Sequence, residues 1–227
     1  PRLDVEPTTV PPRVDSSPRL DAAFGVSYEE YLTANPEART RFNRFMEGGK
    51  DTLAEALAGA DWRGDETVVD VGGGNGALVL ALLERRPGLS GVVFDLPSVA
   101  AEAEERIRAA GLAARCRAVG GSFFETVPAG DVYVLSRILH GWDDERARLI
   151  LHAVRRGLAP RGRLIIADGV VAAPNEPGEK LLDLPMLALG GRERTEEEWR
   201  VLLADGGFEL TRIRLLPFGS ILDAAPV

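Results

Sequence analysis

The most informative absences in this 227-residue sequence are those of cysteine pairs, long apolar runs and excess positive charge. Its one cysteine, Cys116, excludes an internal disulfide bond. No stretch resembles a membrane span, and no charged and then apolar leader opens the sequence. The 27 Lys and Arg residues are interspersed among 35 Asp and Glu residues, and the net charge of -8 argues against nucleic acid or an anionic membrane as a partner. We therefore expect a globular, cytoplasmic protein.

The composition divides the chain into an arm, a helical lead-in and a larger domain. Five prolines in residues 1–19 disfavour regular hydrogen bonding and predict a linker-like arm. Apolar residues at helical spacing predict helices in a lead-in over residues 20–62. From residue 63 to residue 227, predicted strands alternate with predicted helices, which is typical of a parallel sheet with helices on both faces.

The segment Val68–Gly76 predicts a cofactor site. It is a strand that ends in an acid and continues into glycines, so a ligand can approach bare backbone at the carboxyl edge of a parallel sheet. Gly72-x-Gly74-x-x-Ala77 also matches the dinucleotide fingerprint, which is weak alone. Asp70 favours S-adenosylmethionine, because a carboxylate repels a pyrophosphate but attracts a cationic amino group and a sulfonium. Asp95, at the end of the second predicted strand, can accept ribose hydroxyls of either cofactor.

The predicted order of elements indicates the fold class. Strands are expected at 67–71, 91–95, 115–120, 131–136 and 162–168, and helices from 77, at 98–110 and at 143–158. Thr195-Glu196-Glu197-Glu198 is typical of a capping box that opens a further helix. Two last strands at 208–215 and 219–224 have hairpin spacing. This order resembles that of class I methyltransferases, so we expect an α/β fold with a Rossmann-like seven-stranded sheet and an antiparallel C-terminal hairpin.

The two histidines lie in different settings. His152 falls among arginines on the polar side of a predicted helix, which indicates solvated surface. His140 follows the fourth predicted strand, at the same sheet edge as the glycine loop. An imidazole there can take the proton of a phenolic hydroxyl that receives a methyl group, and a carboxylate would fix its tautomer. Glu193 and Asp223 are the candidate carboxylates; the alternative is a structural histidine and a solvated loop acid.

Five ordered motifs between residues 20 and 227 resemble those of the His-dependent O-methyltransferases of plant phenylpropanoid metabolism and bacterial polyketide tailoring. They are VVDVGGGNG at 68–76, FDLP at 94–97, SRILHGWDDE at 136–145, LAPRGRLIIAD at 158–168 and GGRERTEEEW at 190–199. The resemblance implies that His140 is the general base, flanked by Glu193 and Asp223, and that no metal takes part. The cofactor contacts that it implies are Asp70, Gly72, Gly74, Asp95, Leu96, Ser122, Phe123, Ser136 and Arg137. The acceptor contacts that it implies are Phe42, Phe45, Met46 and Trp142.

The sequence departs from the family pattern at several positions. Gly141 stands where the family usually has an acid beside the base, and Asp223 stands where it usually has Glu. Ser122 replaces the Asp that commonly meets the adenine end of the cofactor. The family also carries an N-terminal winged-helix domain that builds its dimer, whereas this chain has the proline-rich arm there. A homodimer is therefore an open alternative rather than an inherited property.

These features predict an S-adenosylmethionine-dependent O-methyltransferase of EC class 2.1.1, acting on a phenolic hydroxyl in natural-product or antibiotic biosynthesis, with S-adenosylhomocysteine as product. Two alternatives keep the fold: an enzyme recruited to hydroxylation, decarboxylation or pericyclic chemistry, and a non-catalytic cofactor-binding module. A nicotinamide oxidoreductase is the remaining alternative. The mass of the product, cofactor binding without turnover, and binding of NADH would distinguish these hypotheses.

Overall fold

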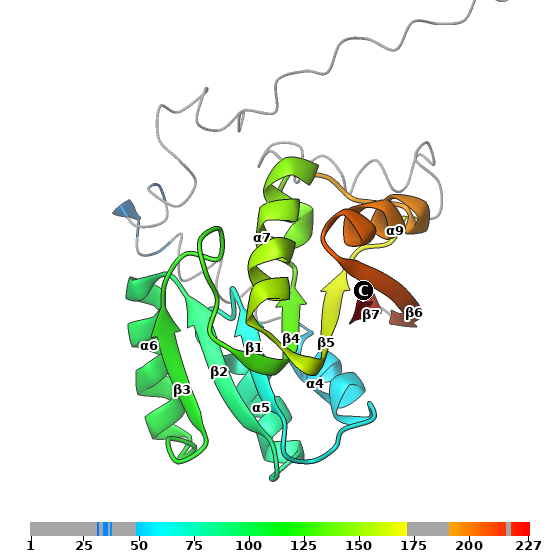
Figure 1. Ribbon diagram of the computed structural model, residues 1–227. Coiled ribbons are helices and arrows are strands. Elements are labelled where there is room, and N and C mark those ends of the chain that lie inside the picture. The colour runs from blue at the N-terminus through cyan, green and yellow to red at the C-terminus, as the bar shows by residue number, and fades with distance from the viewer. Residues whose placement is uncertain (1–30, 32–33, 36, 38–48, 172–190, 217–218) are drawn as a thin grey trace, which may run out of the picture.

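The computed structural model describes residues 31, 34–35, 37, 49–171, 191–216 and 219–227 (Figure 1). The helices are α4 (Lys50–Ala58), α5 (Ala77–Arg85), α6 (Pro97–Ala109), α7 (Asp144–Gly157) and α9 (Glu196–Asp205), and a 3-10 turn, η1, spans Leu139–Gly141. The strands are β1 (Thr67–Val71), β2 (Ser90–Asp95), β3 (Cys116–Gly120), β4 (Gly130–Ser136), β5 (Leu158–Asp168), β6 (Phe208–Leu216) and β7 (Gly219–Pro226).

Within the described residues, the strands form one seven-stranded sheet in the order β3-β2-β1-β4-β5-β7-β6. Strands β1 to β5 pair in parallel, and β7 pairs antiparallel with both β5 and β6. The predicted sheet with an antiparallel C-terminal hairpin is confirmed. The chain runs outward from β1 to β3 and then crosses back to β4, so the carboxyl ends of β1 and β4 adjoin where the strand order reverses. Open α/β sheets bind ligands at such a point.

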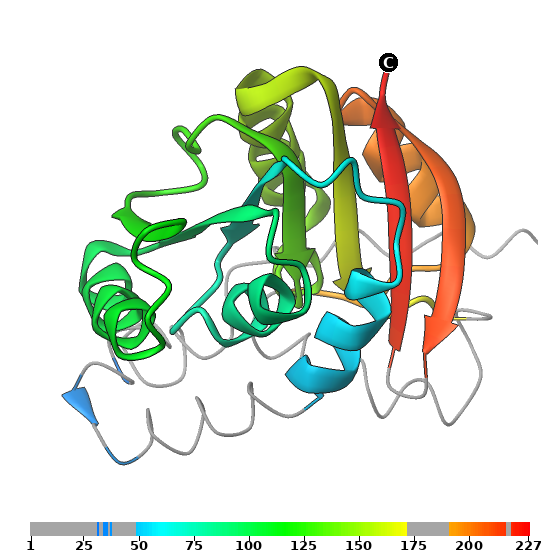
Figure 2. The same ribbon diagram turned by 90° about the horizontal axis from the view of Figure 1, so that it is seen from below.

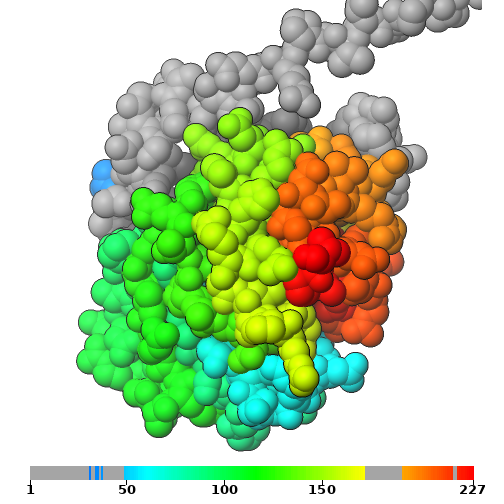
Figure 3. All heavy atoms as spheres, in the orientation of Figure 1, coloured from blue at the N-terminus to red at the C-terminus, as the bar shows by residue number. Residues whose placement is uncertain are grey.

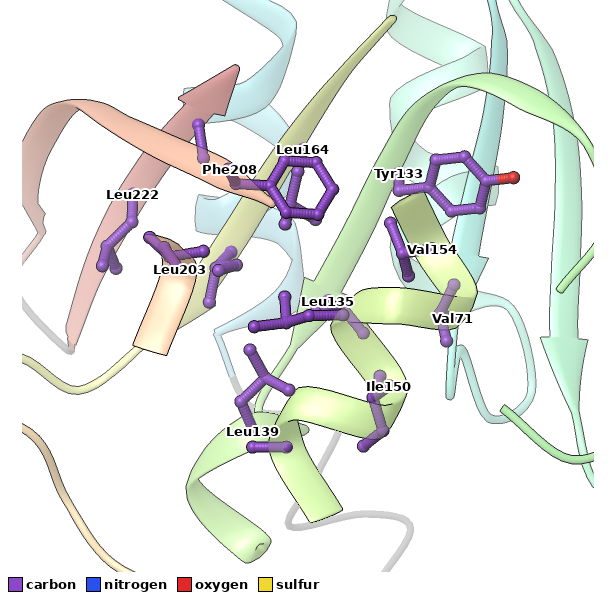
Figure 4. Packing of buried hydrophobic residues seen from close by; sticks show 14 of the residues in the cluster. Val71, Tyr133, Leu135, Leu139, Ile150, Val154, Leu164, Leu203, Phe208 and Leu222 are labelled. Carbon is purple, nitrogen blue, oxygen red and sulfur yellow. The ribbon is translucent and has the colours of Figure 1, made fainter. Parts of the chain in front are cut away.

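The strands bury side chains on both faces of the sheet, because successive residues of a strand point in opposite directions. Helices α7 and α9 cover one face, and α4, α5 and α6 cover the other (Figure 2). On the first face, Leu135 of β4 packs with Ile150 and Val154 of α7 (Figure 4). Its neighbours Val132 and Val134 belong to the core on the second face. This two-sided burial fixes the register of β4, and with it the position of the turn that follows.

Side-chain caps define where α7 and α9 begin. Asp143 accepts a hydrogen bond from the Arg146 backbone N–H at 2.8 Å and caps α7. At α9, the Thr195 hydroxyl accepts from the Glu198 N–H at 3.3 Å, and the Glu198 carboxylate accepts from the Thr195 N–H at 2.9 Å. The predicted capping box is therefore confirmed. The two helices lie next to each other on the molecular surface, α7 in yellow-green and α9 in orange (Figure 3).

The structure extends some predicted elements and leaves others outside the described residues. Strand β5 begins at Leu158, four residues before the predicted strand. Helix α4 is the part of the lead-in that the structure describes as an element, whereas the arm at 1–19 and most of the lead-in at 20–62 lie outside the described residues. None of the helices in the described part of the chain is long and apolar enough to cross a membrane.

Candidate active site at the carboxyl edge of the sheet

Three glycines of the loop after β1 have backbone conformations that other residues rarely adopt. Gly72, Gly74 and Gly76 have φ angles of 69°, 60° and 79°. A Cβ atom on Gly72 would collide with the side chain of Ile138, whereas a Cβ atom on Gly74 would meet no described atom within 4 Å. At Gly74 the loop therefore presents bare backbone beside open space, which allows a ligand to approach closely.

Asp70 lies in β1 with one carboxylate oxygen directed at this loop. The residue is 2% exposed, and its Oδ2 atom has no hydrogen-bond partner among the described residues. A Cβ atom on Gly73 would lie 2.8 Å from that oxygen. Burial raises the pKa of Asp70 to about 6, although the charge of Lys50 lowers it. A buried acceptor without a donor fits a ligand that carries a cationic N–H group, such as the amino group of S-adenosylmethionine.

Asp95 ends β2 with its carboxylate fixed by two backbone groups. Its Oδ2 atom accepts from the Gly74 N–H at 2.8 Å, and its Oδ1 atom accepts from the Leu96 N–H at 2.7 Å. Burial raises the pKa of Asp95, and the two hydrogen bonds oppose that rise. Each carboxylate oxygen can accept a further bond, so a ligand with two neighbouring hydroxyls fits this carboxylate.

The residues after β3 bring aromatic side chains to the same edge. The Ser122 hydroxyl accepts a hydrogen bond from the Phe124 N–H at 3.4 Å. Phe123, Phe124 and Trp142 pack edge to face, with ring centroids between 4.8 and 6.0 Å apart. A Cβ atom on Gly72 would lie 3.8 Å from the Phe123 ring. The structure therefore places Phe123 beside the glycine loop and Trp142 in contact with Phe123.

Strand β4 ends at Ser136, and Arg137 follows in an unusual conformation. Among the described non-glycine residues, Arg137 alone has a positive φ, 57°. Its N–H donates to the Ala167 carbonyl at 2.9 Å, and a Cβ atom on Gly49 would lie 3.5 Å from its Nη2 atom. Arg137 therefore connects the start of α4 with the end of β4. Left-handed backbone at non-glycine residues is concentrated at functional sites.

Turn η1 places the Nδ1 atom of His140 in contact with two carboxylates. The Nδ1 atom lies 3.0 Å from Asp168 Oδ1 and 3.1 Å from Glu193 Oε1. The His140 backbone N–H also donates to Asp168 Oδ2 at 3.2 Å, so one acid holds both the backbone and the ring. Because Nδ1 faces the acids, it carries the proton of the neutral ring, and Nε2 is the basic nitrogen.

His140, Asp168 and Glu193 lie close enough for their charges to shift the pKa values of His140 and Asp168. Burial lowers the pKa of His140, but the hydrogen bond with Glu193 and the charges of Asp168 and Glu193 raise it more, so the pKa lies above 6.5. The charge of Arg137 opposes that rise. Burial raises the pKa of Asp168 to about 6. Two acids at Nδ1 stabilise the imidazolium that forms when Nε2 takes a proton, which is what a general base requires.

The second acid beside His140 is Asp168, not Asp223. The Asp223 carboxylate on β7 forms ion pairs with Arg212 at 2.9 Å and with Arg214 at 3.1 Å. The expectation that Asp223 flanks the histidine is therefore wrong. Asp168 ends β5 inside a motif that the sequence had already singled out, and β5 neighbours β4 in the parallel sheet. An acid at the end of that strand was the signal that could have identified it.

Two glycines, which the sequence did not single out for this role, allow the acids to approach. A Cβ atom on Gly169 would collide with the Glu193 carboxylate, and a Cβ atom on Gly191 would collide with the His140 carbonyl. Position 191 therefore requires glycine because it faces backbone, whereas a side chain at position 169 would displace the Glu193 carboxylate. The predicted acceptor contacts Phe42, Phe45 and Met46 lie outside the described residues, so their role stays a prediction.

The acids and the histidine also form a cluster that could hold a metal ion. Within the described ranges, one ligand atom each from His140, Asp168 and Glu193 lies within 4.8 Å of the others. Imidazole nitrogen and carboxylate oxygen are ligands for zinc and related ions. The same atoms are already at hydrogen-bonding distance, so a proton on Nδ1 also satisfies the cluster.

Comparisons with known proteins identify the domain. The family of O-methyltransferase domains matches residues 15–209. The chain is 44% identical over 213 residues to the phenazine O-methyltransferase PhzM of Lysobacter antibioticus, which covers 92% of this chain and 62% of that protein. It is 41% identical over 223 residues to the O-demethylpuromycin-O-methyltransferase of Streptomyces alboniger, with 92% and 59% covered. The chain thus spans about three-fifths of the length of these curated relatives.

A solved structure and a further relative broaden this picture. The O-methyltransferase NcsB1 from neocarzinostatin biosynthesis, in complex with S-adenosyl-L-homocysteine and 1,4-dihydroxy-2-naphthoic acid, is 33% identical, with a TM-score of 0.83 over 93% of this chain and 65% of that one. The chain therefore has the class I methyltransferase fold that its sequence predicts. The aclacinomycin 10-hydroxylase RdmB of Streptomyces purpurascens is 36% identical over 222 residues, covering 92% of this chain and 59% of that protein.

Proposed function

This chain belongs to the family of O-methyltransferase domains, and on that premise we propose that it methylates a phenolic hydroxyl of a small natural product, with S-adenosylmethionine as methyl donor and His140 as general base. S-adenosylhomocysteine is the second product, and the reaction falls in EC class 2.1.1. One observation carries the proposal: Nδ1 of His140 contacts both Asp168 and Glu193 at the sheet edge that also holds the glycine loop.

The cofactor supplies a methyl group that a cationic sulfur already activates. The chain has to bind and align this group rather than activate it. The buried carboxylate of Asp70 would bind the cationic amino group, and Asp95 would accept the ribose hydroxyls. Gly72 and Gly74 are the backbone contacts that we propose, and Gly74 has open space beside it. Further proposed contacts end or follow strands β2, β3 and β4: Leu96, Ser122, Phe123, Ser136 and Arg137.

The acceptor hydroxyl is the group that the protein has to activate, by removing its proton. A phenol with a pKa of about 10 is mostly protonated near neutral pH, and its oxygen is then a weak nucleophile. Nε2 of His140 takes the hydroxyl proton while the oxygen gains its electron pair for attack. The positive charge on the ring is balanced by Asp168 and Glu193 at Nδ1.

An aromatic acceptor is supported by a solved relative that binds 1,4-dihydroxy-2-naphthoic acid. Trp142, which packs against Phe123 and Phe124, is one aromatic acceptor contact that we propose. Phe42, Phe45 and Met46 are the further contacts that we propose. A cytoplasmic location and the absence of a metal also stay predictions, and a homodimer stays an open alternative.

Turnover of labelled cofactor with a panel of phenols, including 1,4-dihydroxy-2-naphthoic acid, tests the proposal. We expect His140→Ala to lower turnover by about 10²- to 10⁴-fold, as is usual for loss of a general base. His152→Ala is the matched control, because His152 is exposed on α7 and should leave turnover unchanged. A chelator should also have no effect. Undiminished turnover in His140→Ala would refute the proposed mechanism.

Hydroxylation is the second candidate, because a relative 36% identical to this chain is named as a hydroxylase. The two functions differ in the mass of the product. A gain of one methyl group supports methyl transfer. A gain of one oxygen atom from molecular oxygen, with the second atom reduced to water by an added two-electron reductant, supports hydroxylation.

A further inference from the structure

Arg194 holds the backbone on both sides of the proposed base. Its Nη1 atom donates to the Leu139 carbonyl at 2.9 Å, and its Nη2 atom donates to the Trp142 carbonyl at 2.8 Å. These carbonyls belong to the residue before His140 and to the second residue after it. The preceding residue, Glu193, contacts the His140 ring itself. Two consecutive side chains therefore bind one short turn from different sides.

The Arg194 side chain is fully buried and connects three segments of the site. Its Nε and Nη2 atoms donate to Asp144 Oδ1 at 3.0 and 2.9 Å, at the first residue of α7. Its guanidinium lies 5.3 Å from the centre of the Trp199 ring, and the Trp199 Nε1–H donates to the Gly169 carbonyl at 2.9 Å. Gly169 follows Asp168, so the contacts reach the end of β5 as well.

Burying this charge is expensive. A fully buried guanidinium with one carboxylate partner loses its hydration, and an apolar side chain of similar volume commonly gives equal or greater stability. An apolar residue, however, could not donate hydrogen bonds to two carbonyls and a carboxylate at once. The planar fork of Arg can do so. Arg194 therefore contributes by fixing the position of the backbone, and it does so at the turn that carries His140.

The turn needs such support. Turn η1 has three residues, and short 3-10 turns have poor hydrogen-bond geometry of their own. Its internal bonds run from the Gly141 N–H to the Ile138 carbonyl and from the Trp142 N–H to the Leu139 carbonyl, at 3.1 and 3.2 Å. A shift of the turn by about 1 Å would move Nδ1 out of hydrogen-bonding range of both acids.

We propose that Arg194 is a positioning residue for the general base: its buried guanidinium fixes the turn at Leu139–Trp142 so that the His140 ring stays in contact with Asp168 and Glu193. This inference rests on the proposed function only for the role of His140. The placement of the ring is a property of the chain that can be measured without any acceptor.

The proton affinity of the His140 ring reports its placement. The groups that face the ring are Asp168 at the end of β5, Glu193 in the segment before α9, and Arg137 at the end of β4. The two acids raise the pKa of the ring, so a ring that leaves them should titrate at lower pH. Nuclear magnetic resonance of the imidazole carbons can follow this directly, because the sequence contains two histidines. His152, on the outer side of α7, serves as the internal reference.

The experiment compares Arg194→Ala with Arg192→Ala in the free protein. Both variants lose one guanidinium that pairs with Asp144, but the Arg192 side chain bonds Asp144 and Glu198 rather than the turn. We expect Arg194→Ala to lower the midpoint of the His140 titration by about one pH unit, a tenfold loss of proton affinity. Added guanidinium ion should restore it. Arg192→Ala should leave the midpoint unchanged.

An unchanged midpoint in folded Arg194→Ala, or an equal fall in Arg192→Ala, would overturn the proposal. If Arg194→Ala does not fold, Asp144→Asn replaces it, because it removes the charge that orients the guanidinium. We expect this variant to lower the midpoint of the His140 titration by a smaller amount, and an unchanged midpoint would contradict the proposal. Calorimetry with S-adenosylhomocysteine separates this result from the function. A folded chain that does not bind S-adenosylhomocysteine contradicts the proposed function. The titration of His140 tests only the positioning role of Arg194.

Discussion

Replacing Asp70 with Asn should stabilise the free protein while weakening cofactor binding. The Asp70 carboxylate is buried in β1, and one of its oxygens has no partner among the described residues. Asn has nearly the same shape and carries no charge. The folded protein therefore loses the cost of burying an ion, and the cofactor loses the charge that would bind its amino group.

The size of this effect follows from the pKa of about 6, against an ordinary value of 3.8. Each unit of difference corresponds to about 1.4 kcal/mol, so the ionised carboxylate destabilises the folded state by about 3 kcal/mol. Because the raised pKa means that the folded state binds the proton more tightly, the cost is absent below about pH 4 and complete above about pH 6. Asp70→Asn should thus raise the unfolding free energy by up to about 3 kcal/mol at pH 7.5.

Thermal unfolding at several pH values measures the difference. For a chain of this size, about 3 kcal/mol corresponds to a rise of about 6–12 °C in Tm, which should disappear on acidification to about pH 4. The increase in Tm on adding S-adenosylhomocysteine should be smaller in the variant than in the wild type. Asp223→Asn is the matched control: its carboxylate is paired with Arg212 and Arg214, so its loss should lower Tm and leave ligand binding unchanged. A lower Tm for Asp70→Asn near neutral pH would refute the reasoning.

Two further predictions concern the base. In Glu193→Gln, the acidic limb of the pH profile of kcat/KM should move to lower pH, because a neutral amide no longer raises the pKa of His140. The value of kcat should fall about 10- to 100-fold. An acidic limb that stays in place or moves to higher pH would contradict this role of Glu193. In Gly191→Ala, the new methyl group collides with the His140 carbonyl, so turnover should fall about 10²-fold while calorimetry shows unchanged affinity for S-adenosylhomocysteine. Retained turnover in that variant would mean that the segment can move aside.

Much of the sheet and of its ligand-binding edge could be predicted from the sequence, because both depend on local patterns. Apolar runs of strand length alternate with helical periodicity, and the residues after Val71 combine glycines in a way that few other structures require. Asp95 and His140 could be placed because Asp95 ends one predicted strand and His140 lies shortly after the end of another. Parallel strands bring their carboxyl ends to one edge whatever the rest of the chain does.

The partner of the base could not be predicted in the same way, because it depends on register between distant strands. Asp168 pairs with Ser220 on β7, so Asp223 lies three residues away from the edge, roughly 10 Å at the usual rise of a strand. A sequence does not show that offset. Arg194 escaped prediction for another reason: hydropathy patterns place charged residues outside, and its burial becomes visible only with the backbone carbonyls that it binds.

The position of β7 between β5 and β6 has a consequence for how the domain is made. β6 precedes β7 in the chain, and among the described strands it pairs with β7 alone, so it has no place in this sheet until the later strand has been synthesised. Until then, the outer edge of β5, with Leu164 and Ile166, faces no strand. The sheet thus acquires its inner strand last, and a nascent chain that pauses before residue 219 exposes an apolar edge to other chains.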